Sequence, residues 1–112
     1  MRVAKIYYKD TLSGILKETD DGYEFRYLKS YLTSVNPKPI SLTLPVKEES
    51  YKSKVLFPFF DGLIPEGWLL DVAIRNSDIS ILDRMGLLLL CCKDCIGVVS
   101  VIESKEEEVK NA

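Results

Sequence analysis

The chain has 112 residues, of which 46% are hydrophobic and 29% charged, so length and composition predict one soluble globular domain with a single core. The net charge is −2, and residues 103–112 account for it because they hold four Glu and two Lys. The rest of the chain is neutral, which argues against direct nucleic-acid binding, since such proteins normally carry a basic face that neutralises phosphates.

The N-terminus and the apolar stretches give no sign of export or membrane insertion. The chain begins with Met1-Arg2-Val3 and runs directly into alternating residues, without the apolar segment of a signal peptide. The longest apolar stretch, 85–92, is interrupted by Gly86 and is much shorter than the ~20 residues needed to cross a bilayer. We therefore expect a cytoplasmic protein that does not bind membranes.

Residues able to carry chemistry are few. The chain has no histidine, which excludes Ser-His-Asp and Cys-His sites, and it has neither a phosphate-binding glycine loop nor the motifs of a protein kinase. Its three cysteines, Cys91, Cys92 and Cys95, are too few and too close together for a disulfide framework or a four-ligand zinc site. We expect no enzymatic activity, no cofactor and no metal; the C-x-x-C pair at 92–95 leaves a redox role as an alternative to reduced, packed cysteines.

The first quarter of the chain predicts a three-stranded antiparallel meander. Residues 2–8 alternate between two sets of side chains, as a strand does, and turn-forming residues at 9–14 separate them from a second short strand at 14–18. The sequence Asp-Asp-Gly at 20–22 is typical of a tight hairpin turn, because Asp and Gly tolerate positive φ. Aromatic and charged residues then alternate at 23–27.

The middle of the chain is rich in proline. Residues 28–32 are expected to make a helical turn before two prolines end it, and residues 40–44 alternate once more, as in a strand, up to Pro45. The polar stretch 46–54 is expected to be an exposed loop.

The last third changes from a strand period to a helix period. Residues 57–67 carry prolines and glycines among large apolar groups, which suits a rigid, irregular connection. A helix is expected from 66 to 76, a second one from potential caps at 77–80 through Leu90, and a β-branched strand at 96–102.

These elements predict an α+β fold in which a small antiparallel sheet, made of the meander and a closing C-terminal strand, packs with two to three short helices. The predicted domain spans 1–102, and the charged residues 103–112 are expected to form a mobile tail.

The segment from Phe57 to Trp68 is the most unusual part of the sequence. On a helical projection Trp68 lies at the rim of the apolar arc, where it is either a lid over the core or an anchor for a partner. Phe59 and Phe60 are adjacent, so one is expected to fill the core and the other to face a loop or a partner. For Glu66, a structural role is sufficient: its negative charge is expected to stabilise the N-terminus of the helix.

A resemblance to a known family rests on this segment. Residues 59–67, F-F-D-G-L-I-P-E-G, resemble the F-F-x-N-L-L-P-E-G signature of the N-terminal subdomain of HipA-type kinases. In the same register, residues 41–45 resemble the S-x-S-L-P motif of that family, 83–90 its D-x-x-x-L-L stretch and 94–100 its closing strand. The resemblance covers residues 1–102.

Full-length HipA kinases continue into a large kinase body, whereas this chain ends after its charged residues, so it is similar to the HipS antitoxins of three-gene HipBST toxin–antitoxin systems. The resemblance implies that the chain binds and restrains a HipT-like Ser/Thr kinase toxin, in a complex with a HipB-like DNA-binding protein. It implies contacts through the motif segment, with these expected partner-binding residues: Trp68, Phe59, Phe60, Asp61, Leu63, Pro65 and Glu66.

Two alternatives remain at this point. The chain could be a structural subunit that completes the kinase fold or bridges it to the DNA-binding protein without inhibiting anything. It could also be the leftover N-terminus of a truncated HipA, which the genes downstream would decide.

Overall fold

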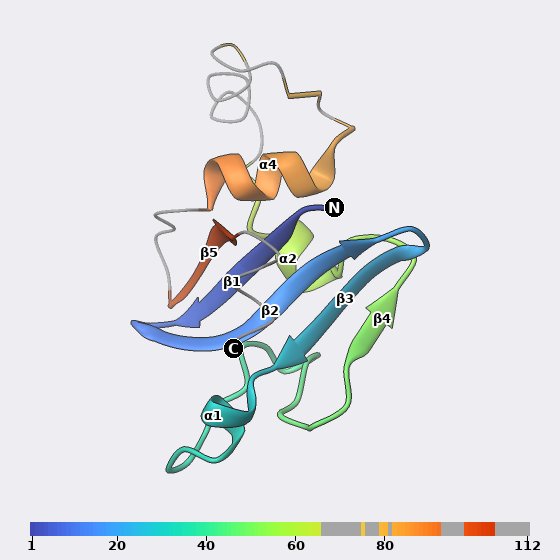
Figure 1. Ribbon diagram of the computed structural model, residues 1–112. Coiled ribbons are helices and arrows are strands. Elements are labelled where there is room, and N and C mark those ends of the chain that lie inside the picture. Colours follow the sequence, from blue (N-terminus) through green and yellow to red (C-terminus); the bar gives the residue numbers. More distant parts are fainter. Residues whose placement is uncertain (66–74, 76–78, 81, 93–97, 105–112) are drawn as a thin grey trace.

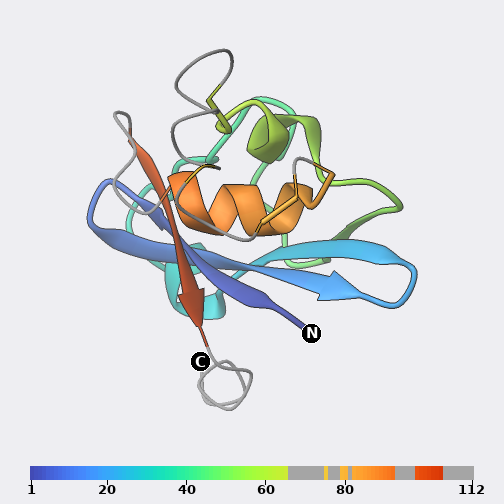
Figure 2. The same cartoon turned by 90° about the horizontal axis from the view of Figure 1, so that it is seen from above.

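The computed structural model describes residues 1–65, 75, 79, 80, 82–92 and 98–104 (Figure 1). Five antiparallel strands form one sheet in the order β4-β3-β2-β1-β5. Helices α2 and α4 cover one face of this sheet (Figure 2). This arrangement confirms the predicted α+β class, with a meander and a closing C-terminal strand.

The meander consists of β1 (Val3–Tyr8), β2 (Thr11–Thr19) and β3 (Gly22–Tyr27). Strand β2 is longer than the predicted 14–18, because the first turn needs only Lys9 and Asp10, with Lys9 at a φ of 55°. The extra length contains a bulge: Ile6 pairs with Gly14 and Tyr7 with Leu12, which leaves Ser13 without a partner in the register.

Ser13 stabilises this bulge with its side chain. Its buried hydroxyl accepts the Tyr8 backbone N–H at 3.1 Å and donates to the Thr11 carbonyl at 2.9 Å. The next residue, Gly14, lies where a side chain has no room, since a Cβ there would be 2.6 Å from the Arg26 carbonyl oxygen and 2.7 Å from the Phe25 ring.

Two expectations for the middle of the chain are wrong. Residues 40–44 form a turn, in which the Leu44 N–H donates to the Ser41 carbonyl at 3.1 Å, and not a strand. The hydroxyl of Tyr27 accepts the Ile40 N–H at 3.1 Å and donates to the Leu44 carbonyl, so a side chain binds backbone groups that a sheet would otherwise pair.

The predicted exposed loop at 46–54 contains a strand, β4 (Tyr51–Ser53), which pairs with β3. The Tyr51 ring stacks on Phe25 at a centroid distance of 6.4 Å, its hydroxyl donates to the Pro45 carbonyl at 2.5 Å, and the Lys47 ammonium lies 4.2 Å from its centroid. Tertiary packing of one aromatic residue thus overrides the polar character of its neighbours.

The helices are short. The helical turn predicted at 28–32 is confirmed as α1 (Lys29–Leu32), and α2 (Pro58–Asp61) lies inside the segment predicted to be irregular. The helix predicted at 66–76 falls outside the described residues, apart from Arg75, which is helical. Among the described residues, no helix has the length and apolar character required to cross a bilayer.

The second predicted helix begins later than the potential caps at 77–80, since α4 comprises Arg84–Cys91. Its start is determined by Asp83, whose carboxylate accepts the Gly86 N–H at 3.1 Å as an N-cap. Strand β5 (Val99–Ser104) pairs with β1 and extends two residues past the predicted domain boundary at 102.

The core lies between the sheet and the helices. Its centre is an aromatic cluster in which Phe25 contacts Tyr27 at 5.0 Å and Phe60 at 5.6 Å between ring centroids. Apolar residues of β1, β2, β5 and α4 join this cluster as fully buried side chains: Ile6, Leu16, Met85, Leu87, Leu88 and Val101.

Candidate partner-binding surface

The described part of the motif segment, residues 57–65, forms a hydrogen-bonded series of turns. Pro58 occupies the first turn of α2, where its missing N–H costs nothing. The N–H groups of Asp61 and Gly62 then donate to the carbonyls of Phe57 and Pro58, both at 2.9 Å, and Leu63 donates to Phe60 at 3.0 Å. These hydrogen bonds hold the turns together, and part of a segment expected to be irregular is helical.

Burial separates the side chains of this segment into two groups. Phe60 is 0% exposed and Ile64 is also buried, because residues four apart on a helical turn share one face. Phe59, Leu63 and Pro65 are half-buried, and Phe59 and Leu63 pack against the core from outside. The expectation that only one of the adjacent phenylalanines fills the core is confirmed, and Phe60 belongs to the core and not to a contact surface.

We call the half-buried residues Phe59, Leu63 and Pro65 the apolar ridge. Phe59 remains in edge contact with Phe60 at 5.2 Å between centroids, so the ridge rests directly on the core. A rigid support of this kind lowers the conformational entropy that a binding surface loses on docking.

Helix α4 holds the motif segment at two points. The Arg84 Nε donates to Asp61 Oδ1 at 2.7 Å, and the buried Cys92 thiol donates to the Leu63 carbonyl at 3.3 Å. Asp61, one of the expected contact residues, is thus paired within the chain. Cys91 and Cys92 form no disulfide, and Cys95 lies outside the described residues, so the redox alternative remains a prediction.

A second ion-pair cluster joins α4 to the sheet. The Arg2 guanidinium donates to both carboxylate oxygens of Glu18, at 2.8 and 3.0 Å, and to both of Asp83, at 2.8 Å each. Hydrogen bonds from Arg2 hold the pKa of each carboxyl below its usual value. No local sequence pattern predicts this cluster, because its residues are far apart in the chain.

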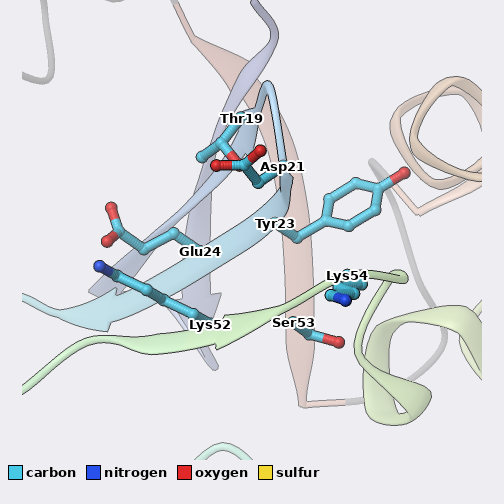
Figure 3. Close-up of a pocket in the computed structure, with 7 residues that line it drawn as sticks. All are labelled: Thr19, Asp21, Tyr23, Glu24, Lys52, Ser53 and Lys54. Carbon is cyan, nitrogen blue, oxygen red and sulfur yellow. The ribbon is translucent and has the colours of Figure 1, made fainter.

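A polar groove of about 390 Å³ lies beside β4, at the β2–β3 hairpin (Figure 3). It is lined by two carboxylates and two ammonium groups together with three neutral polar residues: Asp21, Glu24, Lys52, Lys54, Thr19, Tyr23 and Ser53. Burial, and then the charge of Glu18, raise the pKa of Tyr23, which keeps this phenol protonated at neutral pH. The balanced charges indicate no preferred ligand.

The described residues hold no group of three or more His, Cys, Asp or Glu side chains that could bind a metal ion. Trp68 and Glu66, the other expected contact residues, lie outside the described part of the chain. Their roles stay predictions.

Comparisons with known proteins agree on the family. The model of the HipA N-terminal domain family matches residues 4–102. A solved structure titled "N-terminal domain of HipA toxin" superimposes with a TM-score of 0.72 at 28% identity, covering 95% of each chain. The match is to the N-terminal domain and not to a kinase domain.

Two curated relatives differ greatly in length. An uncharacterized protein of Haemophilus influenzae is 30% identical over 106 residues, covering 95% of this chain and 96% of the relative. A protein of Sinorhizobium fredii named "Putative kinase Y4mE" is 26% identical over 118 residues, covering 98% of this chain but only 26% of the relative. The family model matches nearly the whole length of the chain, and the solved HipA N-terminal domain has the same fold. The chain therefore belongs to the HipA N-terminal domain family.

Proposed function

We propose that this chain is the antitoxin of a tripartite toxin–antitoxin system, and that it binds and inhibits a HipT-type Ser/Thr kinase toxin in the cytoplasm. A HipB-like DNA-binding protein is the third member of the proposed complex. The chain contributes no catalytic group in this proposal and acts by binding.

One observation carries the proposal. The same domain makes up 96% of the small Haemophilus influenzae relative and about a quarter of the Sinorhizobium fredii protein, whose name is that of a kinase. A domain that occurs both alone and fused suggests that an interface made within one chain can also be made between two chains. The apolar ridge of Phe59, Leu63 and Pro65 offers such an interface a rigid apolar centre.

Inhibition would follow if the motif segment pressed against a mobile phosphate-binding loop of the kinase. Loops that cover ATP must close over the phosphates for transfer to occur, so a rigid wedge in their path blocks catalysis without touching the substrate. Trp68 follows the ridge in sequence and is the proposed anchor, since single tryptophans often dominate an interface.

The test pairs the purified chain with a HipT-type kinase. We expect the two proteins to co-purify and the chain to suppress kinase autophosphorylation in a dose-dependent way. Trp68→Ala is expected to stay folded and to lose protection in a co-expression growth assay, whereas Lys54→Ala, at the groove beside β4, retains it. A kinase that neither binds the chain nor changes its activity contradicts the proposal.

The alternative is a non-inhibitory subunit that completes the kinase or bridges it to the DNA-binding protein. The same assay separates the two: the alternative predicts co-purification with unchanged or increased autophosphorylation. The fused arrangement in the Sinorhizobium fredii relative is the observation that keeps this alternative open.

A further inference from the structure

The ion pair between Asp61 and Arg84 connects two elements that have no other described side-chain hydrogen bond with one another. Asp61 is the last residue of α2, and Arg84 is the first residue of α4. The Nε–Oδ1 distance is 2.7 Å, and the two side chains are 42% and 37% exposed, respectively. The pair therefore lies at the surface, next to the residues that follow α2.

The position of Arg84 is itself determined by its neighbour. Asp83 caps α4 through Gly86 and receives two hydrogen bonds from Arg2, whose other partner is Glu18 on β2. The first turn of α4 is thus bonded to the sheet on one side through residue 83, and to the motif segment on the other side through Arg84.

The far end of α4 is held in a similar way. The Cys92 thiol donates to the Leu63 carbonyl, while the Cys92 carbonyl accepts the Val101 N–H of β5 at 3.0 Å. Both ends of α4 therefore bind the sheet and the motif segment at once. Asp61 and Leu63, two residues apart, are the points at which the helix holds that segment.

We propose that Asp61 and Arg84 are positioning residues, which hold the apolar ridge in its binding geometry, and that Asp61 does not itself contact the partner. The proposal rests on the proposed function for the identity of the partner. The 2.7 Å charge-assisted bond fixes the Asp61 side chain against α4, and with it the turn that leads into Leu63.

A double-mutant cycle tests the proposal with Asp61→Asn, Arg84→Met and the double variant, measured as affinity for the HipT-type kinase. Each single change is expected to weaken binding about two- to fivefold, the size typical of a partly exposed ion pair. The double variant is expected to lose less affinity than the sum of the two single losses, because both single changes remove the same Asp61–Arg84 bond. Lys54→Met, a matched loss of one exposed cation, serves as the control and leaves affinity unchanged.

Hydrogen exchange supplies a readout that does not depend on the kinase. We expect the Leu63 and Ile64 amides to exchange faster in Asp61→Asn while the global unfolding free energy changes little. Additive losses in the cycle would show that Asp61 and Arg84 act independently and would overturn the proposal, as would unchanged exchange at these amides. If the wild-type chain fails to bind the kinase, the proposed function fails, and the exchange result still decides whether the pair holds the segment.

Discussion

Arg2 is the residue through which the N-terminus of the sheet meets the start of α4. Its guanidinium binds Glu18 and Asp83 at once, in the forked geometry that only arginine offers to two carboxylates. The three side chains are 34%, 25% and 34% exposed, so water screens the cluster only in part. The backbone adds a further bond, from the Glu18 N–H to the Arg2 carbonyl at 3.0 Å.

Replacing Arg2 with alanine is expected to lower the free energy of unfolding by about 1–2 kcal/mol, since it removes charge-assisted bonds at a partly exposed site and leaves two carboxylates facing one another. Urea unfolding at pH 7 measures the effect. Lys54→Ala, which removes an exposed cation that has no ion pair with another described residue, is the control and should stay within about 0.5 kcal/mol of the wild type. Equal effects of the two changes would contradict a special role for Arg2.

The same cluster predicts a pH dependence. Arg2 lowers the pKa of Glu18 below 4.5 and that of Asp83 below 3.8 in the folded state. Depressed carboxyl pKa values stabilise the fold above those values, and the contribution is lost as the pH falls through the folded-state pKa values. The stability difference between the wild type and Arg2→Ala is therefore expected to be full at pH 6 and to shrink steadily below about pH 4. A difference that is constant down to pH 3 would indicate that packing, and not charge, is responsible.

At the residue scale the sequence predicted alternation well and distant partners poorly. Adjacency alone required that Phe59 and Phe60 face different surroundings, and the burial of Phe60 confirms it. In contrast, Arg2 and Asp83 are 81 positions apart, and only the folded topology brings them together. The pairing of Asp61 with Arg84 could not be predicted from the sequence for the same reason.

At the scale of elements, the junction between the β2–β3 hairpin and β4 depends on one glycine. Gly22 has a φ of 146°, and a Cβ there would be 2.2 Å from the Ser53 carbonyl oxygen at the end of β4. The third strand can thus approach the fourth only because this position has no side chain.

Gly22→Ala is expected to destabilise the protein by at least about 2 kcal/mol, because it combines an unfavourable φ with a backbone clash. Thermal or urea unfolding checks this, with faster amide exchange expected at Tyr51–Ser53. Gly62→Ala is the matched control: its φ is −68° and its nearest atom would be 3.2 Å away, so a change below about 1 kcal/mol is expected. Similar losses for the two glycines would refute the close-approach argument.

The elements that the sequence missed share a physical cause. Residues 40–44 alternate as a strand does, yet the Tyr27 hydroxyl binds their backbone. The polar residues around β4 predict a loop, yet this segment pairs as a strand. Both outcomes depend on aromatic side chains whose targets are distant in sequence, whereas the local turn at Asp20–Gly22 was predicted correctly.

At the scale of the whole molecule, the two ends of the described chain lie side by side. Strand β1 sits between β2 and β5, so the last described strand completes the pairing of the first one. Figure 1 shows β5 beside β1 and beneath α4. The fold is thus closed by its final strand, and β5 contributes Val99 and Val101 to the core.

Truncation is expected to separate this closing strand from the charged residues that follow it. A chain ending at Ser104 should unfold within about 0.5 kcal/mol of the full chain, because it keeps every pair of β1 with β5. A chain ending at Val98 is expected to be unfolded at 25 °C. It loses two buried valines, worth about 1.5–3 kcal/mol each, and every backbone pair of β1 with β5, out of a total stability that is typically about 5–15 kcal/mol. Far-UV circular dichroism with urea unfolding measures both. Cooperative unfolding of the shorter chain would mean that the sheet is stable without β5, while a large loss in the longer one would mean that the domain extends beyond Ser104.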